Sequence, residues 1–459
     1  MNKEVLIKRF QIKELFGIYN VDIPFENYIN IFVGENGLGK TTILNCLNYV
    51  LQRDVDNLYN IDFKEIVITF RSGNKVSIKH NNLVPNSKYN RGRIRRSNLD
   101  IEEYESITYN FLLDNYYKIQ VINPSLTKEQ IKEELIKSIS HFPIYISSRE
   151  IDKIIEEIEK NKHKDWRFQI QNEITNNILY LPTYRRIEED FNKYINNDVK
   201  RDEEISRKFS SLQFGMDDVV KLIEKTCEQL RNTTNEGFKE MTGSLLKNYI
   251  SIIDDEELIE NYTSVNIEES KLRIIFERLA DKIDESVKHK IIELLQNNND
   301  NVDNQSKFFL SIINNLLEIY EKTKHTDESL DNFTKVCNDY LEKNMFVYNP
   351  YEITCELKQK STFKKIEYKH LSSGEKQIVS LFSKLYLSKF TNNIILFDEP
   401  ELSLSIKWQT KLIPDIIAAK KCEFIMVITH SPFIFDNDLK IYTKDIKNFI
   451  TPIEELKSE

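Results

Sequence analysis

Residues 34–41 read Gly-Glu-Asn-Gly-Leu-Gly-Lys-Thr, which is the complete phosphate-loop pattern G-x-x-x-x-G-K-[ST]. The apolar run YINIFV precedes the loop, and TTILNCLNYVL, with helical spacing, follows it. A strand, a glycine loop and a helix in this order let backbone amides turn inward around phosphate oxygens, with the positive end of the helix pointing at them. The stretch therefore predicts an α/β fold that binds a nucleoside triphosphate.

The side chains of this loop have separate expected contacts. Lys40 places a compact positive charge on the β- and γ-phosphates, and the Thr41 hydroxyl is expected on Mg²⁺. The other expected nucleotide contacts in the loop are Asn36, Gly37, Gly39 and Thr42. The sequence thus predicts ATP and Mg²⁺ as cofactors.

A second apolar run ends in two acids. Residues 394–397, Ile-Ile-Leu-Phe, lead directly into Asp398 and Glu399. An acidic pair after a strand usually does no more than end the strand, but here a phosphate loop precedes it in the same predicted sheet. Asp398 is expected to hold Mg²⁺ through water, and Glu399 is expected to orient and deprotonate the attacking water.

Composition limits the function classes. The 459 residues are 40% hydrophobic and 30% charged, and the net charge of −9 argues against a protein that coats nucleic acid over a broad surface. The five scattered cysteines favour reduced thiols over a disulfide framework or a metal site. No run approaches the ~20 apolar residues that span a bilayer, and the N-terminus lacks the apolar core of a signal peptide. We expect a soluble, cytoplasmic protein without a membrane partner.

The pattern of strands and helices predicts three parts. Residues 1–187 form an N-terminal ATPase lobe, and residues 188–346 are an acidic, amphipathic helical insertion with almost no strand signal. Residues 347–459 form a C-terminal lobe in which apolar strands alternate with helices, which implies a mixed or parallel sheet covered by helices. The elements expected in the first part are strands at 3–10, 18–33 and 177–182, a hairpin at 63–80, and helices at 127–140 and 148–160.

Two apolar stripes at helical spacing stand in the middle part. The first runs from Leu272 to Leu294 and the second from Phe309 to Tyr320, with the polar stretch 296–306 between them. Two stripes joined by a polar tip favour a short antiparallel coiled-coil hairpin. Two ordinary helices inside a compact bundle explain the same pattern, so the sequence leaves both alternatives open.

Residues 371–377, Leu-Ser-Ser-Gly-Glu-Lys-Gln, resemble the signature of the ABC ATPase superfamily, which reads LSxGE in the repair and SMC branch. The resemblance implies that Ser373 and Gly374, followed by Glu375, reach the γ-phosphate held by the phosphate loop of a second copy. ATP-Mg²⁺ is then sandwiched in a homodimer at minimum, with higher oligomers left open. Ser373 is also expected to cap the following helix.

Three further segments fit the same family. His430, after the apolar run FIMVIT, matches the switch histidine that senses the γ-phosphate. Leu402–Ser405 fits the dimer-contact loop, although many relatives carry histidine where Ser405 stands. The segment YLPTYRR (180–186) is the candidate for the glutamine loop, with arginines in place of glutamine.

The long stretch between Lys40 and Ser373 resembles the SMC, RecF/RecN and OLD branch of this superfamily. OLD-type nucleases continue after the switch histidine into a Toprim domain, whereas this chain ends 29 residues after His430. We therefore expect no nuclease activity, and we interpret Asp436 and Asp438 as part of a loop.

Two segments, YLPTYRRIE (180–188) and LQFGMDDV (212–219), resemble the ATPase component, AriA, of the PARIS antiphage system, with the Septu ATPase (PtuA) as the nearest competitor. The resemblance implies a sensor or scaffold that controls a separate nuclease or toxin effector and answers a phage-encoded trigger. Two other classes stay open. One is a RecF/SMC-like DNA-repair ATPase that binds duplex DNA, weakly favoured by the arginines at 91–96, and the other is an ATP-gated scaffold with negligible turnover.

Overall fold

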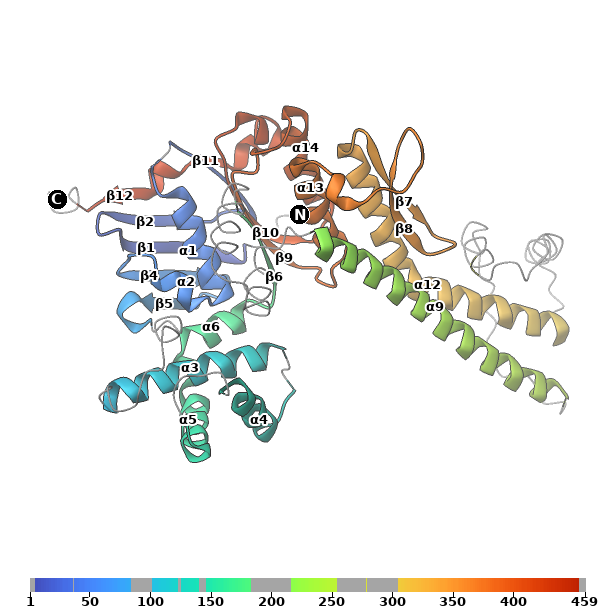
Figure 1. The fold of residues 1–459 in the computed structure, drawn as a ribbon, viewed down its shortest axis with the longest axis horizontal. Coiled ribbons are helices and arrows are strands. Elements are labelled where there is room, and N and C mark those ends of the chain that lie inside the picture. Colours follow the sequence, from blue (N-terminus) through green and yellow to red (C-terminus); the bar gives the residue numbers. More distant parts are fainter. Residues whose placement is uncertain are drawn as a thin grey trace. The chain divides into compact units, whose positions relative to one another are not determined.

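The structure is a computed structural model of the 459-residue chain (Figure 1). It describes residues 5–35, 37–83, 101–122, 125–139, 146–182, 216–253, 278 and 304–453. The chain forms two compact units, one of Met1–Asp202 with Phe390–Glu459 and the other of Glu203–Lys389. The domain boundaries expected at 187 and 346 were drawn from the order of the motifs in the sequence, whereas these units are defined by compactness. The expected boundaries therefore stay a prediction.

A five-stranded parallel sheet carries the first unit. Its strands β3, β10, β9 and β6 lie side by side with β11 at the edge, and all four neighbouring pairs are parallel. β9 is buried along its whole length, as expected for a strand covered on both faces. The predicted parallel sheet of apolar strands is confirmed. In spatial order the strands are β11 (Thr443–Asp445), β3 (Ile29–Val33), β10 (Cys422–Ile428), β9 (Asn393–Asp398) and β6 (Asn177–Leu181).

A second, antiparallel sheet belongs to the same unit. β4 and β5 alternate between buried and more exposed positions and are joined through Gly73, whose φ is 91°. They confirm the hairpin predicted at 63–80. In spatial order the strands are β12 (Ile450–Pro452), β2 (Tyr19–Pro24), β1 (Ile7–Leu15), β4 (Glu65–Phe70) and β5 (Lys75–Lys79).

One hydrophobic core joins both sheets to helix α1 (Lys40–Gln52). The Phe25 ring packs edge-to-face on Phe424 of β10, with ring centroids 5.0 Å apart. Leu44 and Leu47 of α1 are fully buried in the same core. This packing fixes α1 against the parallel sheet. The remaining elements around these sheets are α2 (Val55–Tyr59), α14 (Ile406–Ala418), and the short 3₁₀ helices η1 (His80–Asn82), η6 (Pro432–Ile434), η7 (Asp438–Tyr442) and η8 (Ile446–Phe449).

Four helices pack around a smaller core in the first unit. α4 and α5 confirm the helices predicted at 127–140 and 148–160, and α5 begins with a capping box between Ser147 and Glu150. α3 is a helix that the sequence analysis did not predict. These helices are α3 (Ile101–Ile122), α4 (Lys128–Ile139), α5 (Ser148–Asn161) and α6 (Trp166–Glu173), with the 3₁₀ turn η4 (Lys162–Lys164) before α6.

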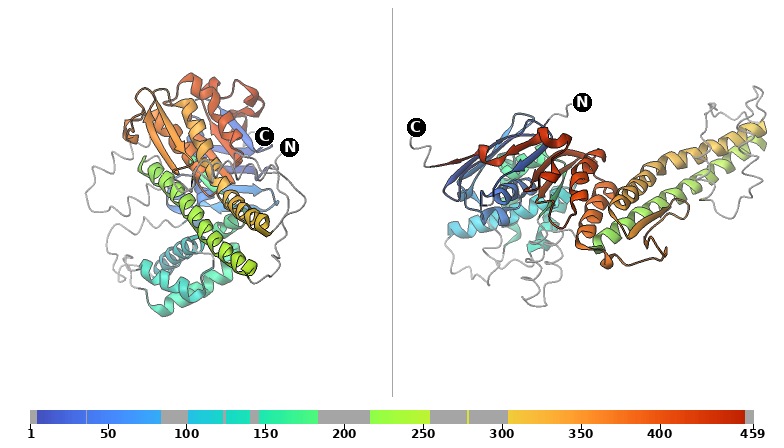
Figure 2. Two further views of the ribbon diagram at one scale, coloured as in Figure 1. Left: turned by 90° about the vertical axis from the view of Figure 1, so that its right-hand side faces the viewer. Right: turned by 90° about the horizontal axis from the view of Figure 1, so that it is seen from above.

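Two long helices dominate the second unit. α9 (Met216–Ile253) and α12 (Asn304–Tyr340) lie side by side and run in opposite directions (Figures 1 and 2). A Cβ atom on Gly237 of α9 would lie 2.7 Å from Ile319 Cγ1, so the close approach of the two helices requires glycine there. The second predicted stripe falls in α12, whose described partner is α9, so the predicted hairpin of the two stripes stays a prediction. The first stripe, apart from Arg278, lies outside the described residues.

The other elements of this unit pack against the helical pair. α13 (Ser373–Leu387) contacts both α9 and α12, with the Tyr340 and Phe382 rings 5.6 Å apart. The hairpin of β7 (Asn344–Asn349) and β8 (Thr354–Gln359) contacts α12, and η5 (Tyr368–His370) precedes α13. The signature helix is therefore anchored on the long helices.

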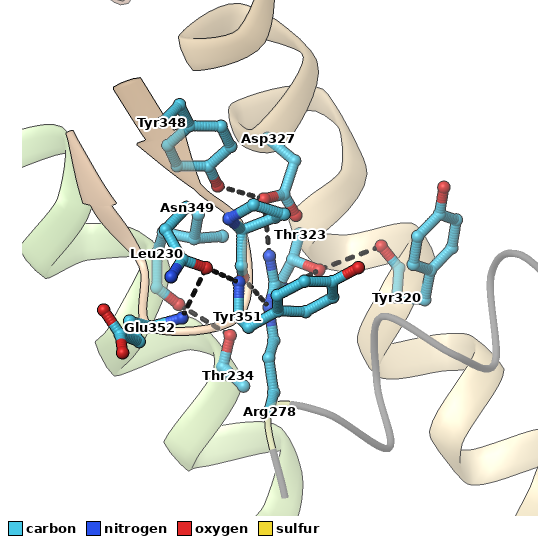
Figure 3. A network of polar contacts seen from close by, with 11 residues as sticks. Leu230, Thr234, Arg278, Tyr320, Thr323, Asp327, Tyr348, Asn349, Tyr351 and Glu352 are labelled. Carbon is cyan, nitrogen blue, oxygen red and sulfur yellow. Dashed lines mark hydrogen bonds and ion pairs between the residues drawn. The ribbon is translucent and has the colours of Figure 1, made fainter. Parts of the chain in front are cut away.

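A polar network ties the β7–β8 hairpin to α12 (Figure 3). Asp327 accepts hydrogen bonds from the Arg278 guanidinium and the Tyr348 hydroxyl. Arg278 also donates to the Pro350 carbonyl at 2.9 Å and to Thr323 Oγ1 at 3.3 Å. Burial and the Asp327 charge raise the pKa of Tyr348, so its hydroxyl stays protonated and donates. Because the Arg278 side chain is only 3% exposed, removing one partner would leave a buried charge uncompensated.

The composition led us to expect no membrane-spanning segment and reduced cysteine thiols. Within the described ranges, no helix is both long and apolar enough to cross a membrane. None of the five cysteines forms a disulfide, and four of them are buried while Cys355 is partly exposed. Burial raises the pKa of the Cys46 and Cys337 thiols, so these two side chains act as small apolar residues.

Candidate functional site

The loop between β3 and α1 turns on two glycines. Gly37 and Gly39 have φ angles of 89° and 73°, a backbone region that other residues rarely adopt. A Cβ atom on Gly34 would lie 2.8 Å from Ile446 Cγ2, so packing requires glycine there as well. Gly39 is the N-cap of α1 and offers no side chain to the first helical amides, which are therefore directed at any ligand in the loop. Asn36 lies outside the described residues.

Lys40 is buried at the start of α1 beside three acids. Its side chain donates from Nζ to the Glu35 carbonyl at 2.6 Å, and the residue is 6% exposed. Burial lowers the pKa of Lys40, and the charges of Glu399, Asp398 and Glu401 oppose this shift. A buried cation held by a carbonyl oxygen is suited to exchange that oxygen for a phosphate oxygen.

Thr41 and Asp398 meet although they are 357 residues apart in the sequence. Thr41 Oγ1 donates to Asp398 Oδ1 at 3.1 Å, where the first turn of α1 faces the carboxyl end of β9. A hydroxyl and a carboxylate are oxygen ligands that suit Mg²⁺, which usually takes one or two protein ligands and completes its shell with water and phosphate. Among the described residues no group of three or more His, Cys, Asp or Glu could hold a metal.

Glu399 and His430 follow neighbouring parallel strands, β9 and β10. His430 Nε2 lies 3.9 Å from Glu399 Oε1, and both side chains are about one-third exposed, at 34% and 27%. Glu399 has a φ of 48°, and its backbone amide donates to the Ile428 carbonyl at 2.8 Å. A left-handed backbone at a residue other than glycine is costly and often marks a functional position. The Glu399 and His430 side chains therefore approach each other where these strands end, and the charge of Glu399 acts on Lys40 at the start of α1.

Two residues next to these, Glu401 and Phe16, were not predicted from the sequence. Glu401 accepts hydrogen bonds from the His430 amide and the Thr429 hydroxyl, both at 2.7 Å. Phe16 is 44% exposed in the turn after β1, and its Cε2 would lie 3.6 Å from a Cβ atom on Gly39. Glu401 could have been found from the sequence, because it is the third acid in the run Asp-Glu-Pro-Glu (398–401). Phe16 had no signal, because its position depends on how the β1–β2 turn folds back on the phosphate loop.

The signature segment starts α13 in the second unit. Ser372 is the N-cap: its Oγ accepts from the Glu375 amide at 3.3 Å, and its own amide donates to Glu375 Oε2 at 2.8 Å. The expectation that Ser373 caps the helix is wrong by one residue, because the reciprocal box needs an acid three positions after the cap. Ser373 is the first helical residue and Gly374 is buried in the first turn. The Glu375 carboxylate is engaged in its own helix start.

The remaining candidate segments differ in what the structure describes. In the expected dimer-contact loop, Ser403 has a φ of 70° and the Ser405 hydroxyl caps α14 by accepting from the Trp408 amide. Tyr180 donates from its hydroxyl to Asn45 Oδ1 at 2.6 Å and so joins β6 to α1. Thr42 lies in the first turn of α1. The segment 183–186, the arginines at 91–96 and residues 212–215 lie outside the described residues.

The fold and this site together define a nucleotide-binding α/β ATPase. The sequence matches the AAA ATPase domain family (AAA_15) over residues 6–435, and the chain belongs to this family. Among curated proteins, no sequence matches the chain.

Three similar solved structures are Smc heads. The Smc head domain with an extended coiled coil, bound to the C-terminal domain of ScpA, from Pyrococcus furiosus is 15% identical, with 99% of this chain and 98% of that chain covered and a TM-score of 0.32. The SmcHead bound to the C-winged helix domain of ScpA is 13% identical, with 94% and 90% covered and a TM-score of 0.32. The Smc head domain with a coiled coil and joint from Pyrococcus yayanosii is 15% identical, with 94% and 93% covered and a TM-score of 0.30.

Proposed function

We propose that this chain binds and hydrolyses ATP-Mg²⁺ where α1 meets the ends of β9 and β10. The contact between Thr41 and Asp398 carries this proposal, because it brings two Mg²⁺-type ligands to the mouth of a glycine loop. Lys40 would bind the β- and γ-phosphate oxygens in place of the Glu35 carbonyl. The amides of the loop and of the first turn, including those of Gly37, Gly39 and Thr42, would surround the phosphates.

In this proposal Glu399 orients the attacking water and accepts its proton as the bond to the γ-phosphorus forms and the bond to the ADP oxygen breaks. His430 is the partner that would contact the γ-phosphate, since it lies 3.9 Å from Glu399 on the exposed side of the sheet edge. Bound Mg²⁺ would neutralise charge on the phosphates. The left-handed turn at Glu399 supports this role because it points the carboxylate away from the strand.

The second half of the site would come from another copy of the chain. Ser373 and Gly374 stand at the start of α13, where unpaired helical amides favour an anion. The capping box of Ser372 and Glu375 holds that helix start in one conformation. ATP would then join two chains in a homodimer, each phosphate loop facing the signature of the partner.

At the level of the cell we propose a cytoplasmic sensor or scaffold of a bacterial antiphage system that controls a separate nuclease or toxin. The support is the resemblance of 180–188 and 212–219 to the ATPase component of PARIS. Closure of two heads around ATP is a rigid-body change large enough to hold or release a bound effector. A phage-encoded trigger would act by shifting that equilibrium.

Mixing two inactive variants tests the shared site. Lys40→Ala and Ser373→Arg should each be inactive, but a mixed two-fold dimer has one site with both faults and one site with none. Random exchange makes about half of the dimers mixed, so the mixture should recover about a quarter of the wild-type rate of phosphate release. Mixing Lys40→Ala with Asp398→Ala is the matched control, because both faults lie on the phosphate-loop side and no site is intact. If neither mixture recovers while exchange of tagged chains is verified, the sandwich is wrong.

A second test addresses the effector. The purified chain should leave plasmid, single-stranded DNA and RNA intact with Mg²⁺ or Mn²⁺, because Asp398 and Glu399 are placed for ATP. Between Asp436 and Asp438, Asn437 accepts from the Leu439 amide at 2.9 Å and forms an ordinary helix cap. Toxicity should appear only when the separate effector is co-expressed. Degradation by the chain alone, lost when Asp436→Ala and Asp438→Ala are combined, would contradict this division of labour.

A further inference from the structure

The Glu401 carboxylate holds the backbone that carries His430. Its Oε1 accepts from the His430 amide at 2.7 Å, and its Oε2 accepts from the Thr429 hydroxyl at 2.7 Å. Thr429 is fully buried, and its hydroxyl in turn accepts from the Ser431 amide at 3.0 Å. In the switch segment, Thr429–Ser431, two residues therefore bond directly to Glu401, and the third bonds to it indirectly, through the Thr429 hydroxyl.

The Gln409 side chain extends this network to the turn that follows β9. Its Oε1 accepts from the Ser431 hydroxyl at 2.6 Å, and its Nε2 donates to the Leu404 carbonyl at 2.9 Å and the Glu401 carbonyl at 3.3 Å. Gln409 is only 8% exposed, so both ends of its amide are used inside the protein. The switch segment and the contact turn, 402–405, are thus fastened to each other through Gln409.

A negative charge at Glu401 is costly for a site that binds phosphates. Its charge acts on Lys40 together with those of Asp398 and Glu399, so it opposes an anionic ligand at the same place. Hydrogen bonds to a carboxylate are about twice as strong as neutral ones, and two of them offset part of this cost. Glu401 does more than accept a hydrogen bond from Thr429. Its other bond is to the backbone amide of His430, whose side chain faces Glu399.

We propose that Glu401 is a positioning residue that fixes His430 relative to Glu399. Through Gln409 it also makes the position of His430 depend on the contact turn. The inference rests on the proposed function, in which the contact turn faces a second copy of the chain. Docking of that copy would then be transmitted to His430 by hydrogen bonds and without movement of the sheet. A displacement of about 1 Å at such a position costs about a hundredfold in rate.

The test compares Glu401→Ala and Glu401→Gln in wild-type and His430→Ala backgrounds. Glu401→Ala should lower kcat at least about tenfold and leave the KM for ATP within about threefold, since it disturbs position and not phosphate binding. Glu401→Gln should recover most of the loss, because its amide can accept from the His430 amide and donate to the Thr429 hydroxyl. In the His430→Ala background Glu401→Ala should change kcat less than about twofold, since residues that act through one another are not additive.

Glu423→Ala is the matched control. Glu423 is the second residue of β10, the strand that His430 follows, and it accepts a hydrogen bond from Asn176 Nδ2 at 2.6 Å. Its loss therefore removes a glutamate hydrogen bond at the opposite end of the strand from His430. Its kcat should equal that of the wild type. Equal losses of kcat from Glu401→Ala in both backgrounds, or a change in KM alone, would overturn the proposal.

Hydrogen exchange measured by mass spectrometry separates this inference from the proposed function. Glu401→Ala removes the acceptor of the His430 amide, so a peptide spanning 424–434 should exchange at least about tenfold faster at one or two amides, whereas Glu401→Gln should stay protected. Hydrogen exchange does not depend on ATP turnover. It therefore tests the positioning role of Glu401 even if Lys40→Ala and the wild type have the same ATPase rate, which would contradict the proposed function. Unchanged exchange in Glu401→Ala would overturn that positioning role.

Discussion

Lys40→Ala should abolish ATP binding, with Kd raised at least about a hundredfold. The ammonium group lies buried between the phosphate loop and three acids, and without it Asp398, Glu399 and Glu401 would repel the phosphates unopposed. Burial lowers the pKa of Lys40, while the three neighbouring carboxylates oppose this shift, so a melting curve of the variant checks that it is folded before binding is measured. Calorimetric titration with ATP-Mg²⁺ measures the binding.

Lys64→Ala is the control for charge alone. Lys64 pairs with Glu14 on the exposed surface, so its loss changes the net charge equally and should leave the Kd unchanged. Retention of wild-type affinity by Lys40→Ala would place the nucleotide elsewhere in the chain.

Glu399→Gln should bind ATP normally and lose hydrolysis by at least about a hundredfold. The amide keeps the shape of the side chain and the left-handed turn, but it cannot accept the proton of the attacking water. ATP should then remain between two chains, and sedimentation velocity should show a dimer with ATP-Mg²⁺ and not with ADP.

The comparison with Glu401→Gln makes this result specific. Both variants remove one negative charge near Lys40, but in the proposed function Glu399, and not Glu401, contacts the attacking water. If Glu399→Gln hydrolyses ATP at nearly the wild-type rate while Glu401→Gln does not, Glu401 is the better candidate for the base.

The parts of the site that the sequence predicts are those with a local signature. The phosphate loop can be recognised in the sequence because positions 37 and 39 need backbone angles that only glycine adopts easily. The buried strand β9 can be recognised in the sequence as an uninterrupted apolar run that ends at Asp398. Because parallel strands end at one edge of a sheet, the proximity of Thr41 and Asp398 follows from the two motifs together.

The parts that escaped prediction depend on contacts between distant turns. The hydrogen bond from the His430 amide to Glu401 joins residues 29 apart in the sequence, in a turn with left-handed backbone at Glu399 and Ser403. Two adjacent serines have equal propensity to cap a helix. Ser372 is the cap because Glu375 lies three residues after it and completes the capping box. The pairing of α12 with α9 depends on close contact at Gly237, which carries no periodic signal in the sequence.

ATP hydrolysis by this chain is best tested by the steady-state rate of phosphate release from the purified wild type, with and without duplex DNA. We expect Mg²⁺-dependent turnover that is absent in Lys40→Ala and that changes less than about twofold when DNA is added. A rate no higher than that of Lys40→Ala would contradict the claim of hydrolysis and favour an ATP-gated scaffold. Stimulation by DNA of about tenfold or more would contradict the proposed role and favour a DNA-repair ATPase.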